Sequence, residues 1–312
     1  MADISGQTVL VTGGAGFIGS HIVDVLAEDN EVRVVDDLSS GSSSRLPDSV
    51  ELVQADIRDS RAIAEATSDV DLIFHQAAKV SVSKSVDDPF RCHFVNTTAT
   101  LGLLESARRE DARVVLASSA AIYGHPRTVP VPENEPKEPK SPYGLQKLSI
   151  DRYARLYHEL YGLETVALRY FNVYGPRQSS GDYSGVIDVF LEQARADEPI
   201  TVDGDGKQTR DFVYVDDVVR ANLLAAKADD FGVAYNIGTG SETAIHELAE
   251  IIKNATASNS SIVHGDPRQG DIQGSCADIS RAVSSLGYAP QVALDDGIER
   301  LLTSYGASPS TV

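Results

Sequence analysis

The chain has little cysteine and no long apolar stretch among its 312 residues. Cys92 and Cys276 lie far apart and form no Cys-x-x-Cys motif, so we expect reduced thiols rather than a disulfide framework. No apolar run approaches the ~20 residues that a membrane-spanning helix needs. The N-terminus also lacks a basic region followed by an apolar stretch, which would indicate a secretion signal. We therefore expect a cytoplasmic protein without a membrane partner.

Positive charge is scarce as well. The chain carries 27 Lys and Arg residues against 46 Asp and Glu residues, which gives a formal net charge of -19 at pH 7. Such a field repels phosphate backbones and argues against a nucleic-acid partner. The acidic residues are spread over the whole length, which is typical of proteins kept soluble in concentrated salt, and we hypothesise a halophilic protein. The seven histidines include no pair at i, i+4, so we expect no metal site.

A glycine-rich turn near the N-terminus indicates a dinucleotide site. A buried, β-branched strand over residues 8–12 runs into the turn, and a helical pattern follows it. Gly13 permits the tight turn, Gly16 lets backbone amides approach a pyrophosphate, and Gly19 allows close packing of helix on strand. The next strand ends at Asp36, at the distance expected for a carboxylate that accepts hydrogen bonds from the adenosine ribose. Asp36, with Asp37 as second choice, therefore favours NAD over NADP.

Strands and helices continue to alternate after the turn, which predicts an α/β fold with a Rossmann-type doubly wound parallel sheet. We expect one long helix over residues 88–109 between two of these strands. We assign residues 1–170 to an NAD-binding Rossmann domain and residues 171–312 to a smaller C-terminal α/β substrate lobe, with returns to the first domain near residues 212–236. The predicted parallel strands are residues 8–12, 31–35, 50–53, 71–74, 113–117 and 164–168.

Several residues follow the carboxyl ends of these strands or lie in the glycine turn, where α/β sheets bind their ligands. The small side chains of Ala77 and Ala78 would let the backbone lie close to a cofactor. We expect the following residues to contact NAD in addition to the glycines and Asp36: Phe17, Ile18, Asp56, Ile57, Gln76, Ala77, Ala78 and Tyr170.

Tyr143 and Lys147 are four residues apart, which places them on one face of a predicted helix. A tyrosine titrates near ~10, and lowering its pKa by roughly three units takes about 4 kcal/mol of preferential stabilisation of the phenolate. A nearby ammonium, with help from a cationic cofactor, could supply that stabilisation and turn Tyr143 into a base. A solvated amphipathic pair is the alternative reading of the spacing. The proline-punctuated stretch over residues 126–142, just before the helix, predicts an irregular flap over a site.

Taken together and in this order, these motifs resemble the extended short-chain dehydrogenase/reductase superfamily. The match covers nearly the whole chain and is most similar to UDP-glucose 4-epimerases and related nucleotide-sugar 4-epimerases. It rests on the glycine turn, Asp36, Asp56-Ile57, Ser118-Ser119 with Tyr123-Gly124, Tyr143 to Lys147, and Arg169 to Arg177. The resemblance implies an NAD-dependent isomerase that passes through a transient 4-keto sugar and forms homodimers through the helix bearing Tyr143 and the helix preceding it.

The resemblance also implies roles for single residues. Tyr143 would take the proton of the sugar 4-hydroxyl, Lys147 would hold the nicotinamide ribose, and Ser119, with Ser118 as a weaker candidate, would hydrogen-bond the reacting oxygen. These three residues form the implied catalytic set. The residues implied to bind the UDP-sugar at its other end are Asn172, Arg210 and Arg268 at the diphosphate, Asp271 at the ribose, and Ser275 at the sugar.

Two departures from related sequences bear on the reaction. Dehydratases of the superfamily carry an Asp-Glu pair directly after the hydroxyl residue, where this chain has Ala120 and Ala121, and methyl groups cannot transfer protons. Ser275 stands where strict UDP-glucose epimerases often carry Tyr, so we expect turnover of UDP-GlcNAc/UDP-GalNAc as well as UDP-glucose/UDP-galactose. The alternatives are a net NAD-dependent oxidoreductase, a decarboxylase or dehydratase of the same superfamily, and a non-enzymatic NAD-binding regulator.

Overall fold

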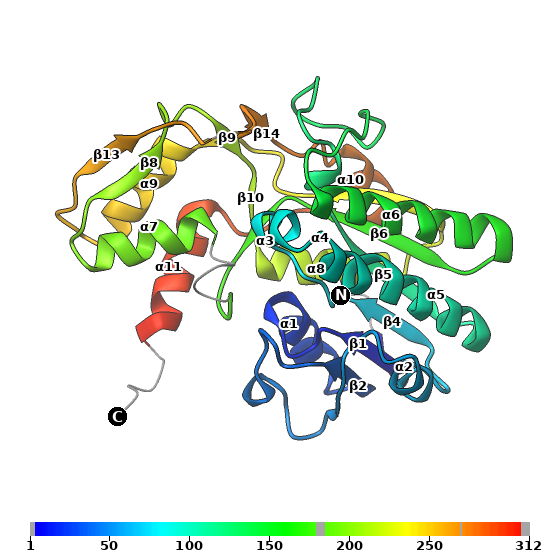
Figure 1. The fold of residues 1–312 in the computed structure, drawn as a ribbon. Helices are drawn as coiled ribbons and strands as arrows, with labels where there is room; N and C mark the ends of the chain where they lie inside the picture. The colour runs from blue at the N-terminus through cyan, green and yellow to red at the C-terminus, as the bar shows by residue number, and fades with distance from the viewer. Residues whose placement is uncertain (1–3, 179–184, 269, 307–312) are drawn as a thin grey trace.

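A parallel sheet of seven strands forms the centre of the molecule in the computed structural model, which describes residues 4–178, 185–268 and 270–306 (Figure 1). The strand order is β11-β6-β5-β4-β1-β2-β3. The chain adds strands first on one side of β1 and then, from β4 on, on its other side, so the fold is doubly wound as predicted. The seven strands are β1 (Thr8–Thr12), β2 (Glu31–Asp36), β3 (Glu51–Gln54), β4 (Leu72–His75), β5 (Arg113–Ser119), β6 (Thr165–Tyr170) and β11 (Val233–Ile237).

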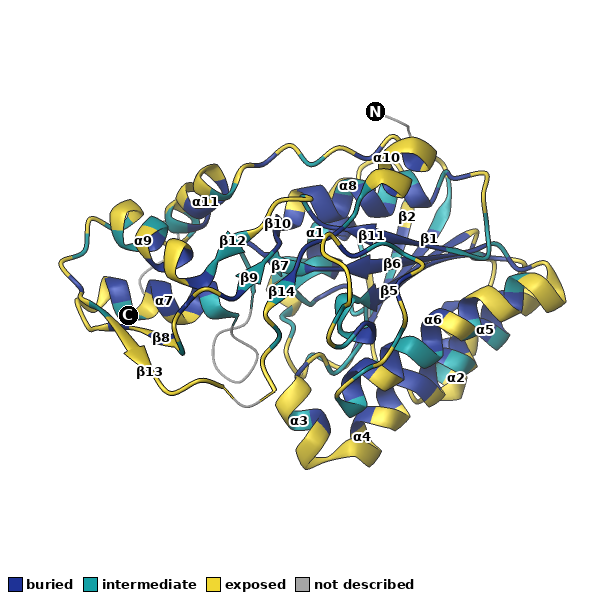
Figure 2. Cartoon of the chain, turned by 90° about the horizontal axis from the view of Figure 1, so that it is seen from above, coloured by how far each residue is buried: buried dark blue, intermediate teal, exposed yellow. Residues whose placement is uncertain are grey.

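Helices cover both faces of this sheet, because its central strands are apolar on both sides (Figure 2). Val9, Leu10 and Val11 of β1, for example, are fully buried. Three helices, α2 (Ser60–Ala66), α5 (Ala99–Glu110) and α6 (Pro142–Tyr161), lie on one face. The other face carries α1 (Phe17–Leu26), α8 (Val215–Ala225) and α10 (Ser280–Leu286). No helix within the described residues is both long and apolar enough to cross a membrane.

The expected helix over residues 88–109 is present at residues 89–110, but it contains one turn of π-helix. Asp88 caps α4 (Pro89–His93) by accepting a hydrogen bond from the Arg91 amide, and a π-helical turn, η2 (Phe94–Thr98), separates α4 from α5. The preceding short helix α3 (Val82–Asp87) was not predicted. The π-helical turn carries Asn96, whose side chain binds the backbone N–H and C=O of Lys79 at 2.7 and 3.0 Å. The π-helical turn therefore carries a contact with the loop after β4, which the apolar pattern does not reveal.

The second half of the chain builds a smaller α/β lobe beside the sheet (Figure 1). Two small sheets bring distant segments together at the junction: β7 (Asn172–Tyr174) with β10 (Phe212–Tyr214), and β9 (Thr209–Arg210) with β12 (Thr243–Ala244) and β14 (Gly274–Ser275). The division of the chain at residue 170 stays a prediction. The remaining elements of the lobe are α7 (Val186–Arg195), β8 (Ile200–Asp203), α9 (Ile245–Ala255), β13 (Ile262–Gly265) and α11 (Leu294–Gly306).

Candidate active site

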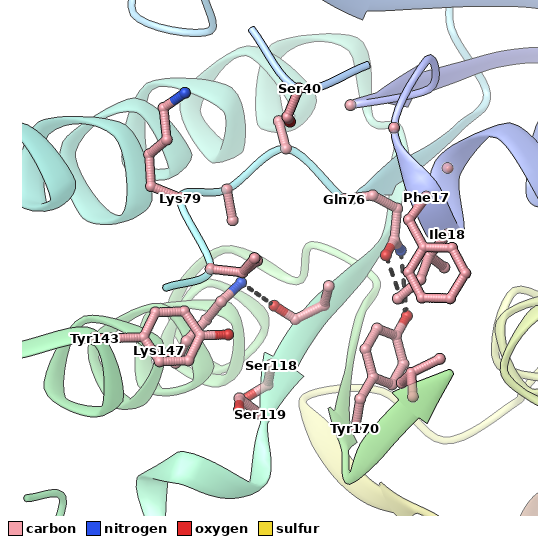
Figure 3. A pocket seen from close by; sticks show the side chains of 18 of the residues that line it. Phe17, Ile18, Ser40, Gln76, Lys79, Ser118, Ser119, Tyr143, Lys147 and Tyr170 are labelled. Atoms are coloured by element: carbon pink, nitrogen blue, oxygen red, sulfur yellow. Dashed lines mark hydrogen bonds between the residues drawn. The ribbon is translucent and has the colours of Figure 1, made fainter. Parts of the chain in front are cut away.

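A cavity of ≈ 530 Å³ runs along the carboxyl ends of the parallel strands, from the glycine turn to β9 and β14 (Figure 3). All residues that the sequence predicted for the site line it except Arg268 and Asp271. Its volume lies within the range of ~300–1,000 Å³ found for small-molecule sites. The stretch over residues 126–142 is irregular, as expected, but none of its residues lines the cavity. It packs instead on the segment after β14, where the Val131 amide donates to the Cys276 carbonyl at 2.7 Å, so the expected flap over the site is wrong.

The glycine turn packs so closely on itself and on the loop after β4 that side chains would not fit at two of its positions. Gly13 has a φ of +70°, and a Cβ there would lie 2.7 Å from the backbone nitrogen of Ala77. A Cβ at Gly19 would collide with the Gly13 carbonyl oxygen. Gly16 caps α1 without any side-chain hydrogen bond, so the first amides of this helix remain available to an anion. This cradle suits the pyrophosphate of a dinucleotide.

Asp36 ends β2 at the rim of the same cradle. Its carboxylate accepts hydrogen bonds from the amides of Ala15 at 3.0 Å and Leu38 at 2.8 Å, which fix its orientation. Burial raises the pKa of Asp36, and the two amide contacts oppose that shift. Asp37 is exposed and accepts a hydrogen bond from the Ser39 amide at 2.9 Å. Asp36 is thus the better placed of the two carboxylates, and it leaves lone pairs for ribose hydroxyls.

Tyr143 and Lys147 lie on the buried face of α6, with 8% and 4% of their surfaces exposed. Ser141 caps the helix by accepting a hydrogen bond from the Gly144 amide at 3.1 Å, and Pro142 occupies the first turn. Lys147 Nζ donates to the Ala117 carbonyl at 2.8 Å, which connects α6 to the end of β5 (Figure 3). The solvated-pair alternative is therefore excluded, because both side chains face the cavity.

The electrostatics of this pair differ from our expectation. Burial raises the pKa of Tyr143 to about 12, and a hydrogen bond with Ser119 opposes the shift without reversing it. Burial also lowers the pKa of Lys147 to about 8. We expected Lys147 to lower the tyrosine pKa, but its ammonium is directed at the Ala117 carbonyl. Within the chain itself, desolvation of Tyr143 therefore outweighs the hydrogen bond that favours its phenolate.

The end of β5 brings the two candidate serines to different places. Ser118 is buried and donates to the Asp151 carboxylate at 3.1 Å, whereas Ser119 is half-buried and faces Tyr143. The geometry thus favours Ser119 over Ser118 as the residue near the reacting oxygen. Ala120 and Ala121 also line the cavity and present only methyl groups. Close approach of α6 to this turn requires glycine at 144, where a Cβ would lie 2.6 Å from the Ala121 carbonyl oxygen.

The far end of the cavity holds the other predicted ligands. The Asn172 amide donates to the Asp211 carbonyl at 3.0 Å, and Arg210 donates to the carbonyls of Thr209 and Ile272, both at 2.8 Å. Asp271 is exposed and does not line the cavity, but its ion pair with Arg210 orients that guanidinium. Arg268 is exposed and outside the lining.

The sequence motifs did not identify Lys79, which lines the cavity, or Asn222, which contacts the lining residue Tyr170 without lining the cavity itself. Lys79, in the loop after β4, donates to Ser39 at 2.7 Å and reaches across the cofactor end of the cavity. Its position after a strand end could have identified it. Asn222 of α8 donates to the Tyr170 hydroxyl at 2.8 Å, and Gln76 donates to the same hydroxyl at 3.2 Å (Figure 3). No sequence signal marks Asn222, since it lies in an ordinary helix.

The sequence is similar to those of nucleotide-sugar enzymes over nearly its whole length. A family model described as "NAD dependent epimerase/dehydratase family" matches residues 9–238. A putative UDP-glucose 4-epimerase of Methanocaldococcus jannaschii is 43% identical over 94% of this chain and 97% of its own. A UDP-glucuronic acid decarboxylase of Arabidopsis thaliana is 32% identical over 95% of this chain and 69% of its own.

Solved structures are similar over the same extent. A UDP-N-acetylglucosamine 4-epimerase of Methanobrevibacter ruminantium, in complex with UDP-N-acetylmuramic acid, is 37% identical with a TM-score of 0.94, covering 97% of this chain and 99% of its own. A UDP-glucose 4-epimerase of Thermus thermophilus, in complex with NAD, is 36% identical with a TM-score of 0.87, covering 97% of this chain and 100% of its own.

Proposed function

We propose that this chain, which belongs to the NAD-dependent epimerase/dehydratase family, interconverts a UDP-sugar and its 4-epimer. The observation that carries the proposal is the meeting of Ser119, Tyr143 and Lys147 in one cavity with the methyl groups of Ala120 and Ala121. This set can remove and return a proton at a hydroxyl, and it offers no acid beside the serine for eliminating water.

The cofactor is NAD, as in the family. Gly13, Gly16 and the start of α1 would hold its pyrophosphate, Asp36 its adenosine ribose, and Lys147 its nicotinamide ribose. When bound, NAD accepts a hydride from C4 of the sugar and gives it back within one turnover.

The chain's own residues would handle the proton. Tyr143 would take the proton of the sugar 4-hydroxyl as a phenolate, which requires the positive charge of the bound cofactor to offset the burial that raises its pKa. Ser119 donates a hydrogen bond to the same oxygen, and the C4–O bond becomes a carbonyl. Lys147 supplies a cation one helical turn away and is protonated below about pH 8. Tyr143 returns the proton after the ring has turned over, so the net change is inversion at C4.

Turning the ring requires a firm hold on the nucleotide and a loose hold on the sugar. Arg210 and Asn172 both line the end of the cavity far from the glycine turn. Arginine binds a diphosphate bidentately, so this end would anchor the substrate while the sugar rotates beside Tyr143. Ser275, small and buried in the lining, supports a pocket that admits 2-N-acetyl sugars.

The test is conversion of purified substrates. The protein is incubated with UDP-glucose, UDP-GlcNAc, their 4-epimers and a dTDP-sugar, and the products are identified by NMR. We expect each UDP-sugar to reach equilibrium with its 4-epimer without added NAD, and Tyr143→Phe to abolish this. Net NADH accumulation at 340 nm would instead identify an oxidoreductase, release of CO₂ from UDP-glucuronate a decarboxylase, and no turnover of any substrate a regulator.

We also propose a homodimer. Large apolar side chains remain exposed on neighbouring helices, with 62% of Val86, 77% of Phe90, 48% of Phe94 and 56% of Leu145 accessible to solvent. Both α3 and α4 contact α6, so the helices that carry these side chains lie together on one side of the molecule (Figure 2). A second copy of the chain, packed about a two-fold axis, would cover the patch with the same patch.

A further inference from the structure

A buried ion pair lies directly beneath the reacting groups. Asp151 of α6 and Arg169 of β6 have 0% and 2% of their side chains exposed. Arg169 donates to both carboxylate oxygens, at 2.8 and 2.9 Å, and Ser118 donates to one of them at 3.1 Å. The carboxylate is thereby held by two strands at once.

The pair is connected to every element that carries a proposed catalytic group. Asp151 lies one helical turn beyond Lys147 on α6, and Ser118 immediately precedes Ser119 on β5. Arg169 pairs with Ser118 in the β5–β6 register and immediately precedes Tyr170. Its remaining donors reach the Tyr123 hydroxyl and the Glu133 carbonyl, both at 3.0 Å.

Helix α6 is consequently attached to the end of β5 at two points. Lys147 donates to the Ala117 carbonyl, and one turn further along Ser118 donates to Asp151. The first attachment uses a side chain that also has to hold the cofactor. The second attachment uses none of the reacting groups, so it can keep the helix in place whatever Lys147 contacts.

Stability alone does not account for such a pair. Removing two charges from water costs several kcal/mol per ion, and well-packed hydrophobic residues are often as stabilising as a buried ion pair. What a bidentate arginine–carboxylate pair provides beyond packing is a defined orientation. Displacement of a catalytic group by ~1 Å can cost about 100-fold in rate, so orientation at this place bears directly on chemistry.

We propose that Asp151 and Arg169 are positioning residues that set Ser119 against Tyr143. This inference rests on the proposed roles of Ser119 and Tyr143 in the proton transfer that accompanies hydride transfer, but not on which sugar is turned over.

The first variants are Asp151→Asn and Arg169→Lys in the full chain. We expect kcat to fall about 10- to 100-fold, because the serine and tyrosine lose their fixed separation. We expect KM for the nucleotide sugar to change less than about threefold, because neither variant touches Arg210 or Asn172. The affinity for NAD, measured by calorimetry, should also stay within about threefold.

A double variant separates positioning from charge burial. Asp151→Leu with Arg169→Met removes both charges together, so no buried charge is left without a partner. We expect its melting temperature to equal or exceed that of Asp151→Asn and its kcat to remain at least 10-fold reduced. A folded variant with wild-type kcat would overturn the proposal, and so would failure of all three variants to fold, which would make the pair a folding element.

Asp217→Asn is the matched control. Asp217 is also a fully buried carboxylate, and it accepts hydrogen bonds from the amides of Gln291 and Val292 at 2.8 and 3.1 Å, outside the cavity lining. We expect this variant to lower the melting temperature without lowering kcat. An equal loss of kcat in the control would show that any buried carboxylate matters, and would overturn a specific role for Asp151.

The readout keeps this inference separate from the proposed reaction. Single-turnover hydride transfer is followed at 340 nm with whichever nucleotide sugar the wild-type chain oxidises, epimerised or not. If wild type forms no 4-epimer but still reduces NAD, the epimerase proposal fails while the expected loss in Asp151→Asn remains measurable. If wild-type and variant transfer rates are equal, the positioning role fails whatever the product is.

Discussion

At the scale of single residues, burial decides the charge states of the site. The phenol of Tyr143 and the ammonium of Lys147 are both pushed toward their neutral forms, with pKa values of about 12 and about 8. A helical Tyr-x-x-x-Lys spacing predicts proximity but not desolvation, because desolvation depends on what packs around the pair. The charge states of Tyr143 and Lys147 therefore depend on the residues packed around them as well as on their spacing in the sequence.

Ser275 is the residue expected to set the sugar preference. It is buried and lines the cavity near Arg210. Replacing it by tyrosine would fill the space that a 2-N-acetyl group needs. We expect Ser275→Tyr to lower kcat/KM for UDP-GlcNAc at least about 10-fold relative to UDP-glucose, a difference of about 1.4 kcal/mol. Competition assays with both sugars measure the ratio, and an unchanged ratio would contradict the role.

His75 is expected to make the protein sensitive to acid. It is buried at the end of β4, with its ring nitrogens 2.7 Å from the hydroxyls of Thr12 and Thr100. Burial, with a smaller contribution from Lys147, lowers its pKa from 6.5 to about 3. Between these values the unfolded chain binds a proton that the folded chain does not, so the free energy of unfolding falls as pH falls below about 6.5.

This histidine is expected to lower the free energy of unfolding by about 2 kcal/mol at pH 5, because pH 5 lies ~1.5 units below 6.5 and each unit contributes about 1.36 kcal/mol. His75→Gln can keep hydrogen bonds to both threonines but cannot titrate. Urea unfolding at pH 7 and pH 5 should therefore show that the free energy of unfolding decreases less in this variant than in wild type. The exposed His93→Gln is the control, and an equal effect in both variants would count against His75.

At the scale of elements, the approach of α6 to the turn after β5 determines where Tyr143 lies. A Cβ at position 144 would lie 2.6 Å from the Ala121 carbonyl oxygen. We expect Gly144→Ala to push the helix away, lowering stability by about 1–3 kcal/mol and kcat by at least tenfold. Thermal melting and turnover give both quantities.

The control for this change is Gly102→Ala in α5, where a Cβ would meet nothing within 4 Å. Alanine is favoured over glycine inside a helix by up to ~1 kcal/mol, so this variant should be more stable and fully active. Should Gly144→Ala behave like Gly102→Ala, the close approach would not constrain the site.

The exposed side chains of α4 provide a second prediction at this scale. Phe90 is 77% exposed, and we place it at the centre of the proposed dimer contact. A buried carboxylate opposite its own copy would be strongly unfavourable, so Phe90→Asp should shift the protein from dimer to monomer. Light scattering after gel filtration measures the mass. Val283→Asp on α10, outside the patch and 47% exposed in wild type, should leave the mass unchanged.

At the scale of the whole molecule, the net charge of -19 is the dominant property. Repulsion among carboxylates opposes the compact state, and salt shortens the screening length from ~10 Å at 0.1 M to ~3 Å at 1 M. We expect the melting temperature to rise between 0.1 and 2 M KCl, and activity to be retained. Sucrose at matched osmolality should stabilise less, and a melting temperature indifferent to KCl would reject the halophilic hypothesis.

Local chemistry was predictable from the sequence wherever a pattern spans a few residues. The sequence predicted a glycine turn between an apolar strand and a helix, and the turn lies between β1 and α1. This was predictable because the close contacts that require Gly13 and Gly19 involve mainly nearby backbone. The alternation of strands and helices predicted a doubly wound sheet, and that prediction is confirmed. Membership of the family follows from the same motifs in the same order.

Tertiary structure decided what depends on distant partners. Asp151 and Arg169 meet only because α6 packs across β5 and β6, and Arg210 faces the cavity only because β9 pairs with β14 from far along the chain. Lys147 donates a hydrogen bond to a carbonyl of β5, and burial raises the pKa of Tyr143 rather than lowering it. Burial and long-range pairing are collective properties of the packed chain, so no short stretch of sequence contains them. The sequence by itself determined which chemical groups the site has, and packing determined their orientation and protonation.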